Sequence, residues 1–292
     1  MDNISINDRY EKFVTFDEPI PYWSHNIKNG DRNGGNCLYF HPIMIRDMYE
    51  FYRYCGCLMT DHSSVLDKSL PFDEAMKVLS MTCYEYLWRE TFQEGKSGIY
   101  IYMFNLLLAL CLKRDEFKNL EYDKFENMYL KPKTSLSKPA FMIDDILYDS
   151  EDFDNIKELI GYQNDLELPD IVKDKRFRDK VAQAKKDKAR ILGSGDKMGG
   201  LEDQLICLSL GYGLSYNDVG KVSIRKFNKM IEYMNKKMHY EIYMTAALSG
   251  FVEFKDKSVL KHWMVAEEKD RYSDVLMDTD EVDAKINGNK ST

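Results

Sequence analysis

The stretch from Leu201 to Met264 constrains the fold of this chain more than any other part of the sequence. From Ile224 onward, apolar residues recur every three or four positions, and this spacing places them on one stripe of a long helix. The stripe consists of Phe227, Met230, Ile231, Met234, Met238 and Ile242. A helix with one apolar stripe must pack that stripe against something, so this stretch predicts a helical packing unit.

Helix boundary signals occur on both sides of Val219. Gly211 and Gly213 can end one helix, because glycine adopts the left-handed conformation that often follows a last helical turn. Ser215 and Ser223 can each begin the next helix, because a serine hydroxyl accepts a hydrogen bond from a free amide in the first turn. Short helices joined by tight turns are therefore expected before the long one.

The rest of the chain also has helical spacing. Further helices are predicted over residues 42–55, 72–92, 99–117 and 144–162, the last beginning at the paired acids Asp144 and Asp145. The longest apolar run, Ile99–Leu112, is shorter than the roughly 20 residues that cross a membrane, so it predicts a buried helix. The predicted fold class is all-α, with two packed helical units and at most a minor β element near Ser249–Asp256.

Composition divides the chain into five segments. Residues 1–40 are rich in turn formers and predict an irregular arm, and residues 41–132 predict an N-terminal helical domain. Residues 133–200, which follow the boundary between Pro132 and Pro139, predict a connector that carries a helix and a basic helix. Residues 201–265 predict a C-terminal helical domain, and residues 266–292 an acidic flexible tail.

Charge bears on the classes of partner. The net charge of −8 disfavours nucleic-acid binding, because a phosphate backbone requires a basic surface. Lys173–Arg190 is an exception, with nine basic and three acidic residues, and it fits either a solvated helix face or a site for an acidic or nucleic-acid partner. The N-terminus resembles no secretory signal, so the host cytoplasm, without membrane association and with reduced thiols, is the expected location.

Residues that could support catalysis or bind a metal do not form a recognised pattern. Cys55, Cys57, His62 and Cys83 are zinc-ligand types, but their spacing differs from that of zinc sites and favours thiols at a helix end. Gly193–Lys197 lacks the remaining residues of a phosphate-binding loop, which favours a flexible linker. We therefore expect no catalytic residue, no cofactor and no metal, and a protein that is not an enzyme.

Two alternatives to an interaction protein involve the same C-terminal region or the N-terminal arm. Residues 216–229 fit a helix-turn-helix, in which Arg225, Lys226, Asn228 and Lys229 would face a DNA groove. A DNA-binding regulator is therefore one alternative, although the apolar stripe continues along the second helix. A structural subunit of a larger assembly is another, because the arm at residues 1–40 could clasp a neighbouring subunit.

Aromatic residues of the C-terminal block are the candidate partner-binding residues. Tyrosine and tryptophan dominate binding hot spots because they supply a large contact area at modest entropic cost. The predicted set is Tyr212, Tyr216, Tyr233, Tyr240, Tyr243 and Trp263. Tyr233 and Tyr240 lie seven residues apart, beside lysines at similar spacing, and could line an exposed aromatic and basic face. Phe227 lies on the apolar stripe and is expected to be buried.

Several short strings along the chain resemble a protein family of tailed phages that infect Firmicutes. They are L-E-D-Q at 201–204, I-R-K-F-N at 224–228, H-Y-E-I-Y at 239–243, S-G-F-V-E-F-K at 249–255 and H-W-M at 262–264. A second matching zone covers residues 47–61 and the region around Tyr84. Together the resemblance spans most of residues 41–272.

The family is similar to tail assembly chaperones, and the resemblance implies a role for this chain. Such a protein would coat the tape measure protein and keep its apolar helices soluble while tail tube subunits assemble around them. The implied partners are the tape measure protein and possibly the tail tube protein, and the chain could also self-associate. The high methionine content, 16 residues, agrees with an adaptable binding surface.

Overall fold

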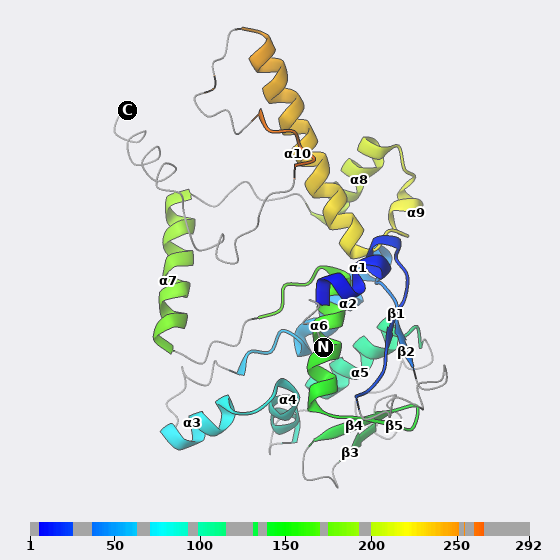
Figure 1. The fold of residues 1–292 in the computed structure, drawn as a ribbon, viewed down its shortest axis with the longest axis vertical. Helices are drawn as coiled ribbons and strands as arrows, with labels where there is room; N and C mark the ends of the chain where they lie inside the picture. Colours follow the sequence, from blue (N-terminus) through cyan, green and yellow to red (C-terminus); the bar gives the residue numbers. More distant parts are fainter. Residues whose placement is uncertain are drawn as a thin grey trace. The chain divides into compact units, whose positions relative to one another are not determined.

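The structure is a computed structural model of the whole chain. It describes residues 6–25, 37–62, 71–92, 99–114, 131–133, 139–169, 175–192, 200–250, 254 and 260–265. The described chain forms two compact units (Figure 1). Unit 1 contains residues 1–171 and 217–228, and unit 2 contains residues 172–216 and 229–292. The long C-terminal helix contributes its first turn to unit 1 and the rest to unit 2.

The N-terminal segment of unit 1 contains regular structure, unlike the irregular arm that its turn-forming residues predict. Helix α1 covers Ile6–Phe16, and strand β1 (Ile20–Tyr22) pairs antiparallel with β2 (Leu38–Phe40). Ile20 and Phe40 face each other in this pair and are fully buried. The short hydrophobic stretches at each end of the turn-rich segment thus form a ribbon against the core, and residues 26–36 between the strands lie outside the described part.

Short helices follow this ribbon in unit 1. They are the 3-10 helix η2 (Ile45–Asp47), α2 (Met48–Tyr54), the 3-10 helix η3 (Cys55–Cys57), α3 (Phe72–Leu79) and α4 (Cys83–Phe92). The single helix predicted over residues 72–92 is divided at Ser80–Thr82. Thr82 and Glu85 form a reciprocal pair, because each side chain accepts the backbone amide of the other at 3.2 and 2.8 Å. This capping arrangement starts α4 as a separate helix.

Helix α5 (Ile99–Cys111) confirms the buried helix predicted from the longest apolar run. Strands β3 (Lys131–Lys133), β4 (Ala140–Ile143) and β5 (Ile146–Tyr148) form an antiparallel sheet in the order β3-β4-β5. The connector at residues 132–139 therefore begins inside unit 1, because β3 pairs with β4. The expected boundary between domains and the observed division into units fall at different places.

Asp144 and Asp145 do not begin a helix, and this prediction was wrong. They have φ angles of 49° and 63° and form the two-residue turn between β4 and β5. Aspartate tolerates positive φ, so a pair of acids suits such a hairpin turn as well as a helix start. Helix α6 begins later, at Ser150, and ends at Asn164.

The core of unit 1 is a cluster of aromatic rings from five elements. Tyr84 of α4 lies 5.1 Å from Phe141 of β4 and 5.2 Å from Phe153 of α6, measured between ring centroids. Phe104 of α5 lies 4.8 Å from Phe153, and Tyr148 of β5 stacks on Phe141 at 5.5 Å. All five rings are fully buried. They fix the small sheet to α4, α5 and α6, since aromatic pairs add to the free energy of burial.

Unit 1 also holds the start of the C-terminal helix α10 (Ile224–Leu248). Ser223 caps it by accepting the amide of Lys226 at 3.3 Å, as the sequence predicts. The segment before the cap pairs with residues 43–46, since the Ile45 amide donates to Val222 O and the Ile224 amide to Ile43 O, each at 2.9 Å. This pairing fixes the first turn of α10 in unit 1.

Unit 2 contains α7 (Lys175–Leu192), α8 (Leu201–Tyr212) and most of α10. Gly213 ends α8 with a φ of 65°, as expected for a left-handed glycine cap, and the short helix α9 (Tyr216–Val219) follows. None of the side chains described in the basic helix α7 is buried. The predicted linker at 193–199, most of the predicted β element at 249–256 and the tail at 266–292 lie outside the described residues.

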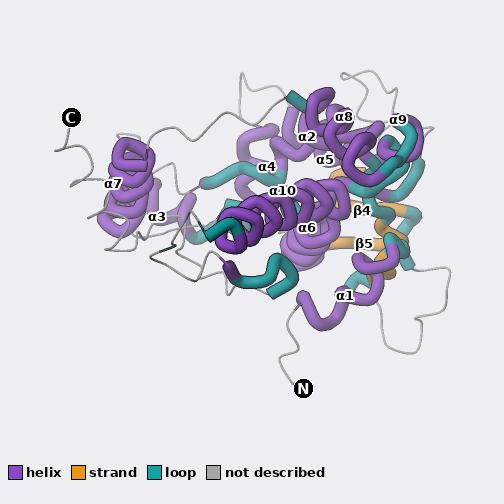
Figure 2. The backbone as a smooth tube through the Cα atoms, turned by 90° about the horizontal axis from the view of Figure 1, so that it is seen from above, coloured by secondary structure: helices purple, strands orange, loops and turns teal. Residues whose placement is uncertain are grey.

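The protein is mostly α-helical, and the prediction of this fold class is confirmed. Figure 2 shows the small share of strand beside the helices. Among the described helices none is both long enough and apolar enough to cross a membrane.

Candidate protein-binding surface

The first turn of α10 binds its own unit through three of the four residues that a helix-turn-helix would present to DNA. Arg225 donates to the Tyr162 carbonyl at 2.6 Å and stacks over the Tyr162 ring, and the Lys226 ammonium lies 2.7 Å from an Asp17 carboxylate oxygen. Asn228 donates to Asp165 at 3.1 Å. These contacts hold the side chains on the body of unit 1, which disfavours base reading at this turn.

The predicted aromatic face of α10 is covered by the chain that follows the helix. Tyr233 lies 6.2 Å from Trp263, Tyr240 lies 5.2 Å from His262, and Tyr243 lies 5.7 Å from Phe254. Lys236 lies over the Tyr233 ring and forms an ion pair with Glu232. The structure therefore brings Tyr233 and Trp263, two of the predicted partner-binding residues, into an intramolecular contact that the sequence did not predict. Tyr233 remains 41% exposed, so its ring is only partly covered.

The other two predicted residues, Tyr212 and Tyr216, lie outside this series of ring contacts. Tyr212 ends α8, where its hydroxyl donates to the Met230 carbonyl at 3.3 Å, and its ring is 46% exposed. Tyr216 begins α9 and is 52% exposed. Both rings are therefore accessible, and Tyr212 lies beside α10 within unit 2.

The apolar stripe of α10 is covered at its start and bare at its end. Phe227 is buried, as expected, and Ile231 is buried too. Near Met234 the stripe meets α8 so closely that a Cβ atom on Gly211 would lie 2.9 Å from the Met234 sulfur. Beyond this crossing the large apolar side chains are exposed, namely Met238 at 52%, Ile242 at 59% and Leu248 at 81%. The stripe thus continues past α8 without a cover among the described residues.

Helix α8 has a second bare apolar face, which the sequence analysis did not select. Leu205 and Leu208 are buried, whereas Ile206 and Leu210 on the opposite side are 44% and 80% exposed. The available signal was composition, because the residues of α8 that follow its polar first turn are almost all apolar, and such helices are usually buried on every side. Together with Leu248, these residues extend the exposed apolar surface of unit 2 beyond the predicted set.

The described thiols are poor candidates for catalysis or for binding a metal. Cys55, Cys57, Cys83 and Cys111 are buried, and burial raises the pKa of each thiol, to about 12 for Cys55. A thiol that stays protonated is a weak nucleophile and a weak metal ligand. The predicted helix-end thiols Cys55 and Cys57 lie in η3, as expected.

One group of described residues has the composition of a metal site, namely His25, Asp149 and Asp152. The carboxylate of Asp152 is fully buried and already accepts the hydroxyls of Tyr22 and Ser24, both at 2.8 Å. It also accepts the backbone amides of His25 and Asp149, at 3.2 and 3.1 Å. Because both of its oxygens are occupied by protein donors, this cluster fits a structural clasp better than a metal site.

His25 connects the two carboxylates of this clasp. Its ring nitrogens lie 3.1 Å from Asp149 and 3.2 Å from Asp152. Burial alone would lower the pKa of His25, but the negative charges of Asp152 and Asp149 outweigh it and raise the pKa above its ordinary value. The clasp therefore ties the segment after β1 to the first turn of α6, and it is strongest when His25 is protonated.

Comparison with protein families gives a match in the C-terminal part of the chain. Residues 196–267 match the family described as the second domain of YomV. This is a Bacillus phage-type family. The match therefore supports a phage protein, and it covers the α8–α10 region. No curated protein and no solved structure matches the chain.

Proposed function

We propose that this chain is a non-enzymatic phage tail assembly chaperone that binds the tape measure protein. The single observation that carries the proposal is the bare end of the apolar stripe on α10, formed by Met238, Ile242 and Leu248. Met238 and Ile242 lie one turn apart on the same face, and Leu248 adds exposed apolar surface near the end of the helix, which together suit an amphipathic helix of a partner. The match over residues 196–267 supports the coarser part of the proposal, that the chain is a phage protein.

The energetics of this surface fit a carrier that must release its cargo. Burying one fully exposed large aliphatic side chain contributes about 1.5–3 kcal/mol, and these three are 52–81% exposed, so their burial contributes roughly 3–6 kcal/mol. Association itself costs about 4–15 kcal/mol, so a single helix would be held weakly. A long partner with many apolar helices could bind several copies of this chain, and growth of the tail tube could displace them one after another.

Co-expression with the tape measure protein of the same phage tests the proposal. The wild-type chain should keep that protein soluble and elute with it, whereas the double variant Met238→Glu/Ile242→Glu should not. Phe72→Glu/Met76→Glu is the matched control, because it places the same two charges, four residues apart, at exposed apolar positions of α3 in unit 1. If the tape measure protein stays insoluble with the wild-type chain, the proposal fails.

Composition of the finished virion separates this proposal from a structural role in the tail. A chaperone leaves during assembly, so mass spectrometry of purified particles should detect this chain only in trace amounts. Abundant peptides from it would instead assign it to the virion as a tail subunit.

A further inference from the structure

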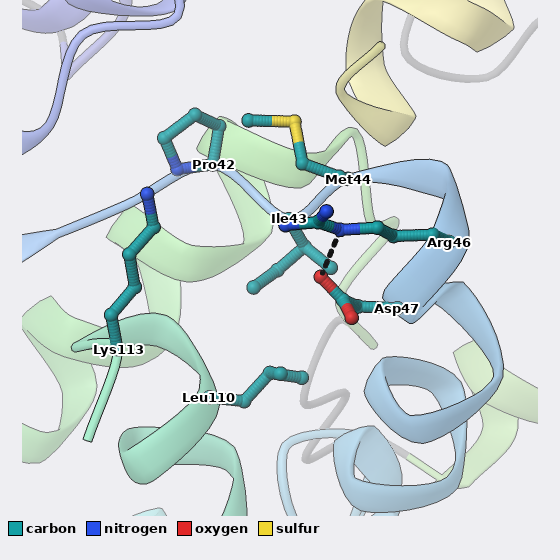
Figure 3. A pocket seen from close by; sticks show the side chains of 7 residues that line it. All are labelled: Pro42, Ile43, Met44, Arg46, Asp47, Leu110 and Lys113. Atoms are coloured by element: carbon teal, nitrogen blue, oxygen red, sulfur yellow. Dashed lines mark ion pairs between the residues drawn. The ribbon is translucent and has the colours of Figure 1, made fainter. Parts of the chain in front are cut away.

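Unit 1 contains a pocket between the segment before α2 and the end of α5, with a volume of about 170 Å³ (Figure 3). Its apolar lining consists of Pro42, Ile43, Met44 and Leu110. An engineered apolar cavity of about 150 Å³ holds one benzene ring, so a single ring or a branched chain of four or five carbons fits this volume. The pocket is thus large enough for one small apolar group.

The charged residues of the pocket are Arg46, Asp47 and Lys113. Figure 3 shows Lys113 on one side of Ile43 and Arg46 on the other. Asp47 lies 3.5 Å from Arg46, and since the Arg46 side chain is largely open to water and the Asp47 side chain partly so, this ion pair is weak. Within the described part of the chain Lys113 has no ion pair. Two cations and one carboxylate leave a net positive charge at the opening.

The backbone holds Lys113 in a conformation that lysine rarely adopts. Its φ angle is 53°, and it occupies the position after α5 where glycine is usual. The amides of Lys113 and Arg114 donate to Leu110 O at 3.3 Å and to Ala109 O at 2.8 Å, which closes the helix end. Because His41 donates to the Cys111 carbonyl, that oxygen is also occupied. A lysine is therefore not needed to cap α5, and its placement beside the pocket suggests another role.

We propose that this pocket binds a small apolar carboxylate, with its hydrocarbon part against Ile43 and Leu110 and its carboxylate between Lys113 and Arg46. The apolar floor and the net positive opening complement the two halves of such a molecule. The same chemistry occurs in free branched-chain or aromatic acids and in the last residue of a polypeptide. The site is independent of the α10 surface and of the proposed function.

Titration calorimetry with isovalerate and with its neutral amide tests this site in the full chain. Isovalerate should bind saturably at millimolar concentration, and the amide at least about tenfold more weakly, because it lacks the charge that Lys113 and Arg46 recognise. Acetylated tripeptides ending in leucine, as the free acid and as the amide, test the second source. Whichever acid binds more tightly identifies the source of the ligand.

Lys113→Gly is the decisive variant, because glycine suits the left-handed backbone position while removing the ammonium group. It should weaken binding of the acid about tenfold without lowering the melting temperature. Lys77→Gln, which removes a charge from the exposed surface of α3, should leave binding unchanged. Equal binding of acid and amide, unchanged binding by Lys113→Gly, or no binding of either acid would each overturn the proposal.

Discussion

Replacing Asp152 by asparagine should destabilise unit 1 by about 3 kcal/mol. Asparagine keeps the size of the side chain, but one of its two polar atoms becomes an NH2 group. In either orientation this NH2 group faces a backbone N–H group, that of His25 or that of Asp149, and two donors cannot form a hydrogen bond. The variant loses charge-assisted hydrogen bonds, at about 1.5–3 kcal/mol each, and leaves at least one buried donor without an acceptor, which costs about 1–3 kcal/mol.

Urea unfolding followed by circular dichroism measures this loss at neutral pH. Glu158→Gln is the matched control, because Glu158 lies exposed on the same helix and its replacement should change stability by less than about 0.5 kcal/mol. A loss below about 1 kcal/mol for Asp152→Asn would show that the clasp between the N-terminal ribbon and α6 contributes little. The reasoning about its five donors would then be refuted.

Four further predictions concern His25, Gly213, Phe227 and the pair Tyr233 and Tyr240. Because folding raises the pKa of His25, protonated His25 stabilises the fold at any pH below its ordinary pKa, and this stabilisation is lost as the pH rises through the raised pKa. His25→Gln should therefore destabilise the protein more at about pH 5.5 than at about pH 8.5. Gly213→Ala should destabilise unit 2 by about 1 kcal/mol in thermal unfolding, because its φ is 65°. Phe227→Ala should cost about 3–5 kcal/mol in the same assay. Tyr233→Ala/Tyr240→Ala should lower the melting temperature by less, because these rings pack on Trp263 and His262 but are only partly covered.

Helices with strong local signals could be predicted from the sequence. The regular stripe from Ile224, the Ser223 cap and Gly213 each act within one or two turns, so α8 and α10 have the expected boundaries within a few residues. The apolar run at residues 99–112 likewise predicts α5, because a helix that is apolar on every side must be buried.

Contacts between distant residues could not be predicted in this way. The ribbon of β1 and β2 depends on a pairing across residues 26–36 and on Asp152, more than 125 positions away from Ser24 and His25. Coverage of Tyr233, Tyr240 and Tyr243 by the following segment also depends on the fold, since spacing along a helix shows only which residues share a face. The pocket beside Lys113 could not be predicted either, because it depends on the positive φ angle of Lys113 and on the packing of residues 42–47 near the end of α5.

Site-specific photo-crosslinking tests the central claim, that the bare end of the α10 stripe holds apolar helices of the tape measure protein. A photoreactive amino acid would replace Ile242 in one preparation and Phe72, an exposed apolar residue of unit 1, in another. Each would be co-expressed with the tape measure protein and irradiated. The account predicts a cross-link to that protein from position 242 and little or none from position 72. Equal cross-linking from both positions, or none from position 242, would contradict it.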